Sequence, residues 1–76
     1  VVFEWEWWQE PDGDFRLMAV VPDDWYIDLR VHADGSGEVG YYEDDQLELG
    51  AEWYADGSGQ WWEYDSGVLV DSGSWG

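Results

Sequence analysis

The most constraining feature of this sequence is a five-residue segment, Ala33-Asp34-Gly35-Ser36-Gly37, that returns as Ala55-Asp56-Gly57-Ser58-Gly59. Both copies lie between aromatic flanks in which apolar and polar residues alternate. Asp and Ser side chains can hydrogen-bond the backbone two residues on, and Gly accepts a positive φ, so each copy suits a tight reversal of the chain. We therefore expect two similar β-hairpin tips.

Alternation with a period of two continues through most of the chain and predicts short strands. It is cleanest from Trp25 to His32, and turn residues such as Pro11-Asp12-Gly13, which predicts a three-residue hairpin loop, separate the alternating runs. No window shows apolar residues at helical spacing over three turns. The expected strands cover residues 3–10, 15–21, 25–32, 39–43, 47–54, 60–65 and 68–70.

These patterns predict an all-β fold, a small antiparallel meander of six to seven short strands, with no substantial helix. We expect a single domain over residues 1–76, its sheet curled into a half-barrel over an aromatic core that includes Trp5 and Trp53. A chain of this size buries only about 60% of its unfolded surface, so its eight Trp, five Tyr and two Phe must supply the core. The register after Gly37 stays open, and residues 74–76 are expected to form a loose tail.

Charge limits the kinds of partner. Nineteen Asp and Glu face only Arg16 and Arg30, and the formal net charge is −17. Such a field repels nucleic acids and anionic membranes and attracts cationic surfaces. We expect no direct binding to nucleic acid or membrane. Because Val1-Val2-Phe3 runs directly into Glu4 and Trp5, nothing there resembles a signal peptide or membrane span, and a soluble cytoplasmic protein is expected.

Residues for catalysis or metal binding are scarce. The chain has no Cys, and His32 is its only His, so neither a thiolate zinc site nor a multi-His site can form. The segment from Asp34 to Val39, with Glu43, shares part of the spacing of an EF-hand loop, but its first ligand position is His32 and its flanks alternate as strands. No nucleophile elbow and no phosphate-binding loop is present. We expect no enzyme, no metal and no cofactor.

The leading hypothesis is an acidic, tryptophan-rich inhibitor that mimics a nucleic acid in protein–protein interaction. Same-face residues on a strand recur about every 6.6 to 7 Å, near the spacing of successive phosphates, so rows of carboxylates can imitate a phosphate backbone. The expected partner is a basic nucleic-acid-binding protein such as a nuclease or CRISPR effector, as for anti-CRISPR-like phage proteins and nuclease-immunity proteins. The proposed contacts are the acids Glu4, Glu6, Asp28, Glu43, Asp44, Asp45, Glu48 and Glu52 and the rings Trp8, Tyr26 and Tyr54.

Other hypotheses remain open. The acidity can be a halophile's solvated surface on a structural domain. The outward residues Trp8, Met18, Tyr26 and Tyr54 are either scattered surface residues or parts of a contact patch such as a homodimer interface.

The last third of the chain suggests a third hypothesis. Trp53-Tyr54, Asp56-Gly57, Gly59, Trp61-Trp62, Tyr64, Asp65-Ser66-Gly67, Leu69 and Gly73 together resemble a bacterial choline-binding repeat. That resemblance implies a carbohydrate- or choline-binding module with a cation–π cage of Trp and Tyr.

Overall fold

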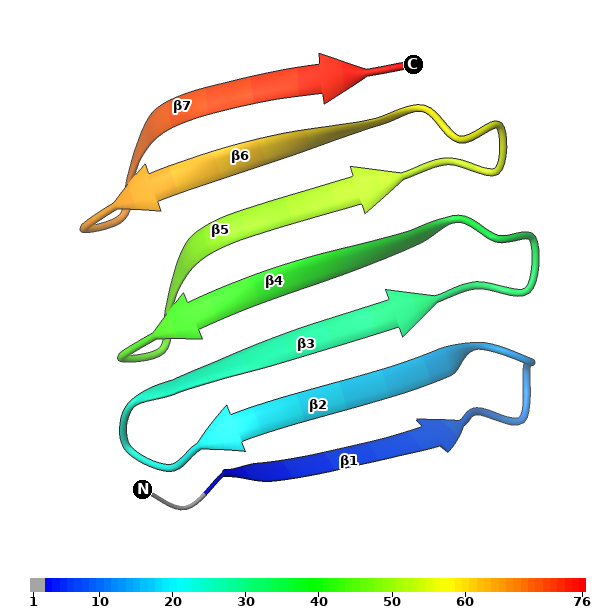
Figure 1. Cartoon of the computed structure of the whole chain (residues 1–76), viewed down its shortest axis with the longest axis horizontal. Coiled ribbons are helices and arrows are strands. Elements are labelled where there is room, and N and C mark those ends of the chain that lie inside the picture. Colours follow the sequence, from blue (N-terminus) through cyan, green and yellow to red (C-terminus); the bar gives the residue numbers. More distant parts are fainter. Residues whose placement is uncertain (1–2) are drawn as a thin grey trace.

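A computed structural model describes residues 3–76 as seven antiparallel strands in one open sheet, with no helix in that range (Figure 1). The strands pair in chain order, β1-β2-β3-β4-β5-β6-β7, so the predicted all-β meander is confirmed and the sheet does not close into a barrel. The targeting prediction rests partly on Val1 and Val2, which lie outside the described residues. The strands are β1 (Glu4–Gln9), β2 (Phe15–Val21), β3 (Trp25–Val31), β4 (Gly37–Glu43), β5 (Gln46–Trp53), β6 (Gly59–Asp65) and β7 (Val68–Trp75).

The hairpin tips at one end of the sheet share a single design. In Glu10–Asp14, His32–Ser36 and Tyr54–Ser58, the first residue's N–H donates to the fifth residue's carbonyl at 2.7, 2.8 and 2.8 Å. The third residue is Asp in each tip, and its carboxylate accepts the fifth residue's N–H at 3.0, 2.9 and 2.9 Å. The fourth is Gly, with φ of 98°, 92° and 90°. The sequence predicted two similar tips and a three-residue hairpin loop at Pro11-Asp12-Gly13. The design that this loop shares with the two tips was missed, because only Asp-Gly is common to all three.

The three tips begin 22 residues apart, at Glu10, His32 and Tyr54, and two turns at the opposite end of the sheet are also 22 residues apart. Asp44-Asp45 and Ser66-Gly67 link strand pairs through two residues that both have positive φ, from 51° to 82°. This is the turn that matches the right-handed twist of the flanking strands. The β2–β3 connection, Pro22-Asp23-Asp24, is one residue longer and has positive φ only at Asp23.

Tryptophan rings lie flat over glycines on the neighbouring strand. A methyl group at Gly37 would meet the Trp53 ring closer than 3.0 Å, and one at Gly59 would meet the Trp75 ring in the same way. The two indoles donate to the Gly35 and Gly57 carbonyls at 2.9 Å. The prediction of a loose tail is therefore wrong, because this contact and pairing with β6 continue β7 through Trp75.

Two bulges correct the expected alternation. Tyr41 pairs with Leu49 but Tyr42 pairs with Leu47, so Glu48 is an extra residue and Leu47 joins Tyr42 on the opposite face from Leu49. Unbroken alternation along the expected strand 47–54 would place Leu47 and Leu49 on one face, and the bulge is the reason that they lie on opposite faces. A second bulge, with Val70 as its extra residue, lies 22 residues further along.

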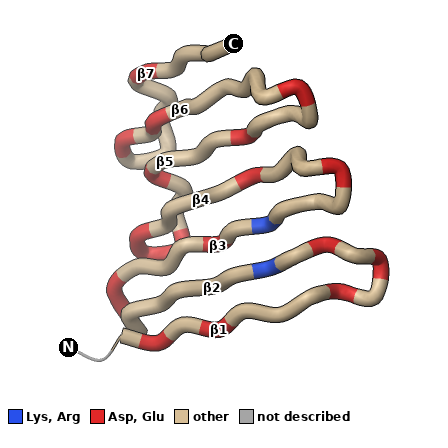
Figure 2. Tube along the Cα trace, turned by 45° about the vertical axis from the view of Figure 1, so that its right-hand side comes forward, with Lys and Arg blue, Asp and Glu red and all other residues tan. Residues whose placement is uncertain are grey.

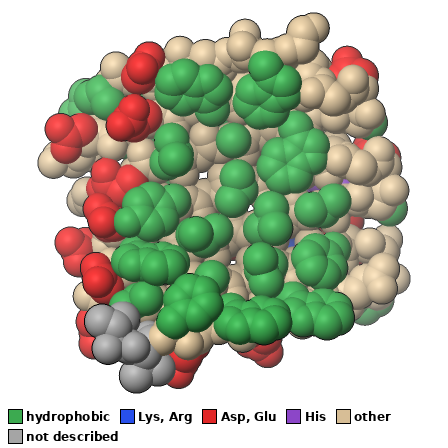
Figure 3. Space-filling view, in the orientation of Figure 1, with side chains coloured by type: hydrophobic (Ala, Val, Ile, Leu, Met, Phe, Trp, Pro, Cys, Tyr) green, Lys and Arg blue, Asp and Glu red, His purple; other side chains and the backbone are tan. Residues whose placement is uncertain are grey.

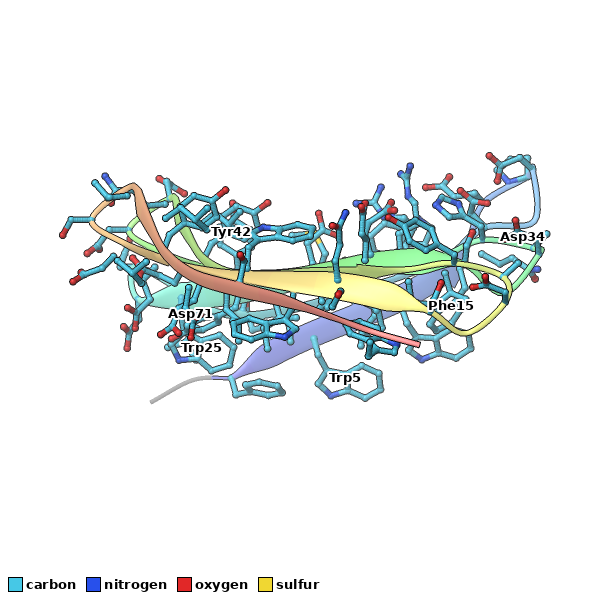
Figure 4. The ribbon with its side chains drawn as sticks, turned by 90° about the horizontal axis from the view of Figure 1, so that it is seen from above. Trp5, Phe15, Trp25, Asp34, Tyr42 and Asp71 are labelled. Carbon is cyan, nitrogen blue, oxygen red and sulfur yellow. The ribbon has the colours of Figure 1, made fainter. Side chains whose placement is uncertain are left out.

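The sheet is a single layer of 34 × 30 × 16 Å, with one face apolar and one mostly polar. Trp5 and Trp25 project from one side of the ribbon, and Tyr42 projects from the other (Figure 4). The register places these residues together on what we call the apolar face: Phe3, Trp5, Trp7, Phe15, Leu17, Ala19, Val21, Trp25, Ile27, Leu29, Val31, Val39, Tyr41, Leu49, Ala51, Trp53, Trp61 and Trp75.

No closed core forms behind this face. Among residues 3–76, Val21 is the only buried hydrophobic side chain, whereas Trp5 is 60% exposed and Trp7 58% exposed. The expectation that Trp5 belongs to the core is therefore wrong for the single chain, and Trp53 is half-buried over Gly37. The alternation placed Trp5 and Trp53 on one face as expected, but one sheet has no second layer to bury its rings.

Candidate functional site

The cations of this chain are gathered on the polar face. Arg16 and Arg30 are direct cross-strand neighbours on β2 and β3, side by side in Figure 2. The Arg16 guanidinium lies 3.0 Å from the Asp28 carboxylate. The Asp14 carboxylate contacts both remaining basic side chains, at 3.9 Å from Arg30 Nε and 3.0 Å from His32 Nδ1. Hydrogen bonds to Asp14 and then Glu38 raise the pKa of His32. Every Arg and His of the chain is thus engaged by a carboxylate on this face.

The turn end of the sheet between β2 and β5 carries acids without such partners. The β2–β3 and β4–β5 turns lie side by side, since Asp44 N–H donates to the Asp24 carbonyl at 3.5 Å. No cation of residues 3–76 forms an ion pair with the carboxylates of these turns. They border a shallow hollow of about 350 Å³ that includes Trp25 and Tyr26. We call the four turn acids that line this hollow, together with Glu43 at the adjoining end of β4, the acidic edge: Asp23, Asp24, Glu43, Asp44 and Asp45.

The carboxylates of the acidic edge act through their combined negative potential, and their arrangement is not that of a metal site. Within the described range, no group of three or more His, Cys, Asp or Glu is arranged to hold a metal ion. Glu43 accepts the Tyr41 hydroxyl at 2.8 Å, and this hydrogen bond raises the pKa of Tyr41. Unpaired carboxylates in adjacent turns add their potentials, which attracts a cationic surface and speeds its encounter.

The predicted acidic contacts divide between free and committed groups. Glu4 and Glu6 are exposed on the polar face of β1, and Glu43, Asp44 and Asp45 belong to the acidic edge. Asp28 is neutralised by Arg16, and Glu52 accepts the Tyr54 hydroxyl at 2.9 Å and a bond from Gln60. Glu48 lies in the bulge, where its charge contributes to the raised pKa of Tyr41 on the apolar face. The eight acids therefore do not form one continuous row.

Of the three aromatic rings predicted to contact a partner, two already contact neighbouring side chains within the sheet. Trp8 is half-buried, donates to Glu10 at 3.1 Å and has the Arg16 guanidinium 5.5 Å from its ring centre. Tyr26 stacks on Tyr42 with ring centres 4.6 Å apart, and burial raises its pKa. Only Tyr54, 46% exposed, stands out as predicted. The interpretation of Trp8 and Tyr26 as outward, exposed rings needs this correction.

The aromatic residues of the choline-like segment do not converge on one cage. Trp53 and Trp61 belong to the apolar face, whereas Trp62 and Tyr64 project from the other side of the sheet. A cation–π cage needs several ring faces around one point. Trp62 instead lies over Gly50, where an added methyl group would meet its Cε2 atom at 2.7 Å.

Sequence reasoning missed the largest feature, the uncovered apolar face. Figure 3 shows hydrophobic side chains spread across it, with acidic side chains along the margin where the acidic edge lies. The alternating aromatic residues were the available signal, and counting layers as well as strands would have revealed the uncovered face.

The described part of the chain contains no helix of the length and apolarity that a membrane span requires. Comparisons of the chain with family models, curated proteins and solved structures find no match.

Proposed function

We propose that this chain is a non-catalytic binding domain that docks on a basic, nucleic-acid-binding surface of another protein. The observation that carries the proposal is the acidic edge, four carboxylates on adjacent turns and Glu43 at the end of β4, none with an ion-pair partner among residues 3–76. A surface that binds phosphates with Lys and Arg offers the matching charge pattern. The partner class is a nuclease, CRISPR effector or similar protein, and the effect is inhibition by occupying its nucleic-acid groove.

The division of the acids refines which residues take part. Asp28 and Glu52 are held by neighbours within the sheet, so their exchange for partner contacts brings little gain. Among the described residues, the four turn acids Asp23, Asp24, Asp44 and Asp45 have no ion pair to give up on binding, whereas Glu43 exchanges its hydrogen bond from Tyr41. Glu4 and Glu6 extend the negative surface along β1. Tyr54 begins the β5–β6 tip, at the opposite end of β5 from the acidic edge, and supplies an exposed ring that can stack on Arg.

The test begins with affinity capture at low and high salt. Each captured protein is then assayed for competition between this chain and the DNA or RNA which that protein binds. Mimicry requires that nucleic acid displaces the chain and that added salt weakens binding steeply. Capture of proteins that bind no nucleic acid, or binding that nucleic acid leaves unchanged, would refute the proposal.

Charge removal at the edge then separates a specific surface from bulk acidity. The double variant Asp44→Asn/Asp45→Asn keeps residues that tolerate positive φ and removes two charges from the acidic edge. We expect binding at least about tenfold weaker. The matched control Glu63→Gln/Asp71→Asn removes two charges from β6 and β7 and leaves binding nearly intact. Equal losses in both variants would mean that only net charge matters, as in the solvated-surface hypothesis.

A further inference from the structure

The apolar face combines protruding rings with an apolar hollow. Trp5 and Trp7 stand out from β1, at one edge of the sheet. Over β3 to β6 the same face is recessed into a hollow of about 390 Å³, lined by Ile27, Val39, Tyr41, Leu49, Ala51 and Trp61. Cross-strand pairing puts Trp5 in one row with Tyr41 and Leu49, and Trp7 in the next row with Val39 and Ala51.

We propose that a second copy of this chain covers the apolar face, in a two-fold symmetric pair of stacked sheets. An axis parallel to the strands and above β3 places β1 of each copy over β5 of the other, because each strand lies two positions from β3. A rotation about that axis keeps every residue in its row. Trp5 and Trp7 of each copy then enter the rows that line the hollow of the other, so one contact is made twice.

The distribution of charge favours a second copy over the basic partner at this face. The side chains that β1 to β5 direct into its centre are uncharged, so a cationic surface finds no complement there. Glu63 and Asp71 face each other across β6 and β7. With the axis above β3, these two strands overhang the partner copy, and both carboxylates stay in water.

The contact area is sufficient for a stable pair. Five overlapping strands spaced about 4.8 Å apart, each about 24 Å long at about 3.4 Å per residue, cover a footprint of roughly 600 Å² on each copy. The total of roughly 1,200 Å² reaches the range of stable, specific interfaces. A lone sheet with one apolar face lacks that burial. This interface covers Glu43, which faces the apolar side opposite Trp25, only at its margin, and it leaves the turn carboxylates Asp23, Asp24, Asp44 and Asp45 free. The pair therefore forms whether or not the proposed basic partner exists.

The first experiment is sedimentation velocity on the full chain over a wide concentration range, at low and high salt. We expect a species of twice the 8.8 kDa chain mass that gains population with salt, because salt screens repulsion between two copies of charge −17. A chain that stays monomeric at every concentration while its far-ultraviolet circular dichroism shows an intact sheet would overturn the proposal. So would a partner of different chemistry that saturates the apolar face.

Three variants then test the geometry. Trp7→Glu puts a charge into the interface and should raise the dimer dissociation constant by about a hundredfold. The control Tyr54→Glu makes the same change off the apolar face and should leave dimerisation unchanged. Ala51→Trp fills the hollow, so it should weaken the dimer although it adds apolar surface. A dimer strengthened by Ala51→Trp would show non-specific apolar association and contradict the proposed arrangement, even if Trp7→Glu failed to fold.

Discussion

Glycine and tryptophan form matched pairs across strands in this sheet, and the pairing decides what each residue tolerates. Gly50 and Trp62 are direct cross-strand neighbours on β5 and β6, with the indole lying over the glycine. The glycine supplies the room that the ring needs, and the ring covers backbone that a glycine leaves open. The presence of glycine at position 50 and tryptophan at position 62 therefore follows from their contact, and not from the intrinsic preference of either residue for a strand.

This pairing predicts that the effect of Gly50→Ala on the free energy of unfolding changes sign when the Trp62 ring is removed. Gly50→Ala should destabilise the protein by about 1 to 3 kcal/mol, because the methyl group displaces the Trp62 ring. In a Trp62→Ala background the same substitution should be neutral or stabilising by up to about 1 kcal/mol, since alanine then costs less than glycine in a strand. Urea unfolding of the four proteins measures the coupling. If Gly50→Ala lowered the stability equally in both backgrounds, the Trp62 ring would not be the reason that position 50 requires glycine.

At the scale of elements, the turn between β4 and β5 holds a backbone conformation that its residues do not favour. Asp44 and Asp45 have φ of 51° and 61°, where an Asn followed by a Gly is the preferred pair. The double variant Asp44→Asn/Asp45→Gly should stabilise the chain by about 1 kcal/mol by relieving this strain. The variant Asp44→Asn/Asp45→Asn is the control, because it removes the same charges and keeps a side chain at the second position. Thermal unfolding compares the two, and identical midpoints would assign the gain to charge alone.

The elements also show where sequence reasoning succeeds and where it stops. Period-two alternation and the Asp-Gly-Ser-Gly tips were enough to predict an antiparallel meander, with strand bounds within two residues for all strands but the last, which runs to Trp75 instead of ending at Val70. The bulge at Glu48 was not predictable, because Leu47 and Leu49 look like ordinary alternation until Tyr42 is paired. Trp75 was assigned to a loose tail because its partner, Gly59, lies on the neighbouring strand β6, and the sequence alone does not show this pairing. The acids Glu43, Asp44 and Asp45 were selected from their run in the sequence, but Asp23 and Asp24 join them only through strand pairing.

For the whole molecule, unbalanced charge opposes folding. A net charge of −17 on so thin a sheet gives strong self-repulsion, and the few cations all lie on one face. Raising the salt from about 0.1 M to about 1 M shortens the screening length from about 10 to about 3 Å. We expect stabilisation of about 1 kcal/mol, which raises the melting temperature by about 4 to 8 °C.

Calorimetry over a salt series checks this expectation at a fixed protein concentration, since association also responds to salt. The variant Glu63→Gln/Asp71→Asn, with two fewer charges, should gain less from the same series. A melting temperature that stays constant or falls as salt increases would contradict it.

The pairing of every strand with its neighbour in the chain also bears on how the molecule forms. No contact in such a meander requires closing a loop longer than one hairpin, so contact order is low and the entropy lost in each closure is small. The sheet can zip together hairpin by hairpin in a unimolecular process. Covering its exposed tryptophans is bimolecular, and therefore a dilute solution slows the second event while leaving the first untouched.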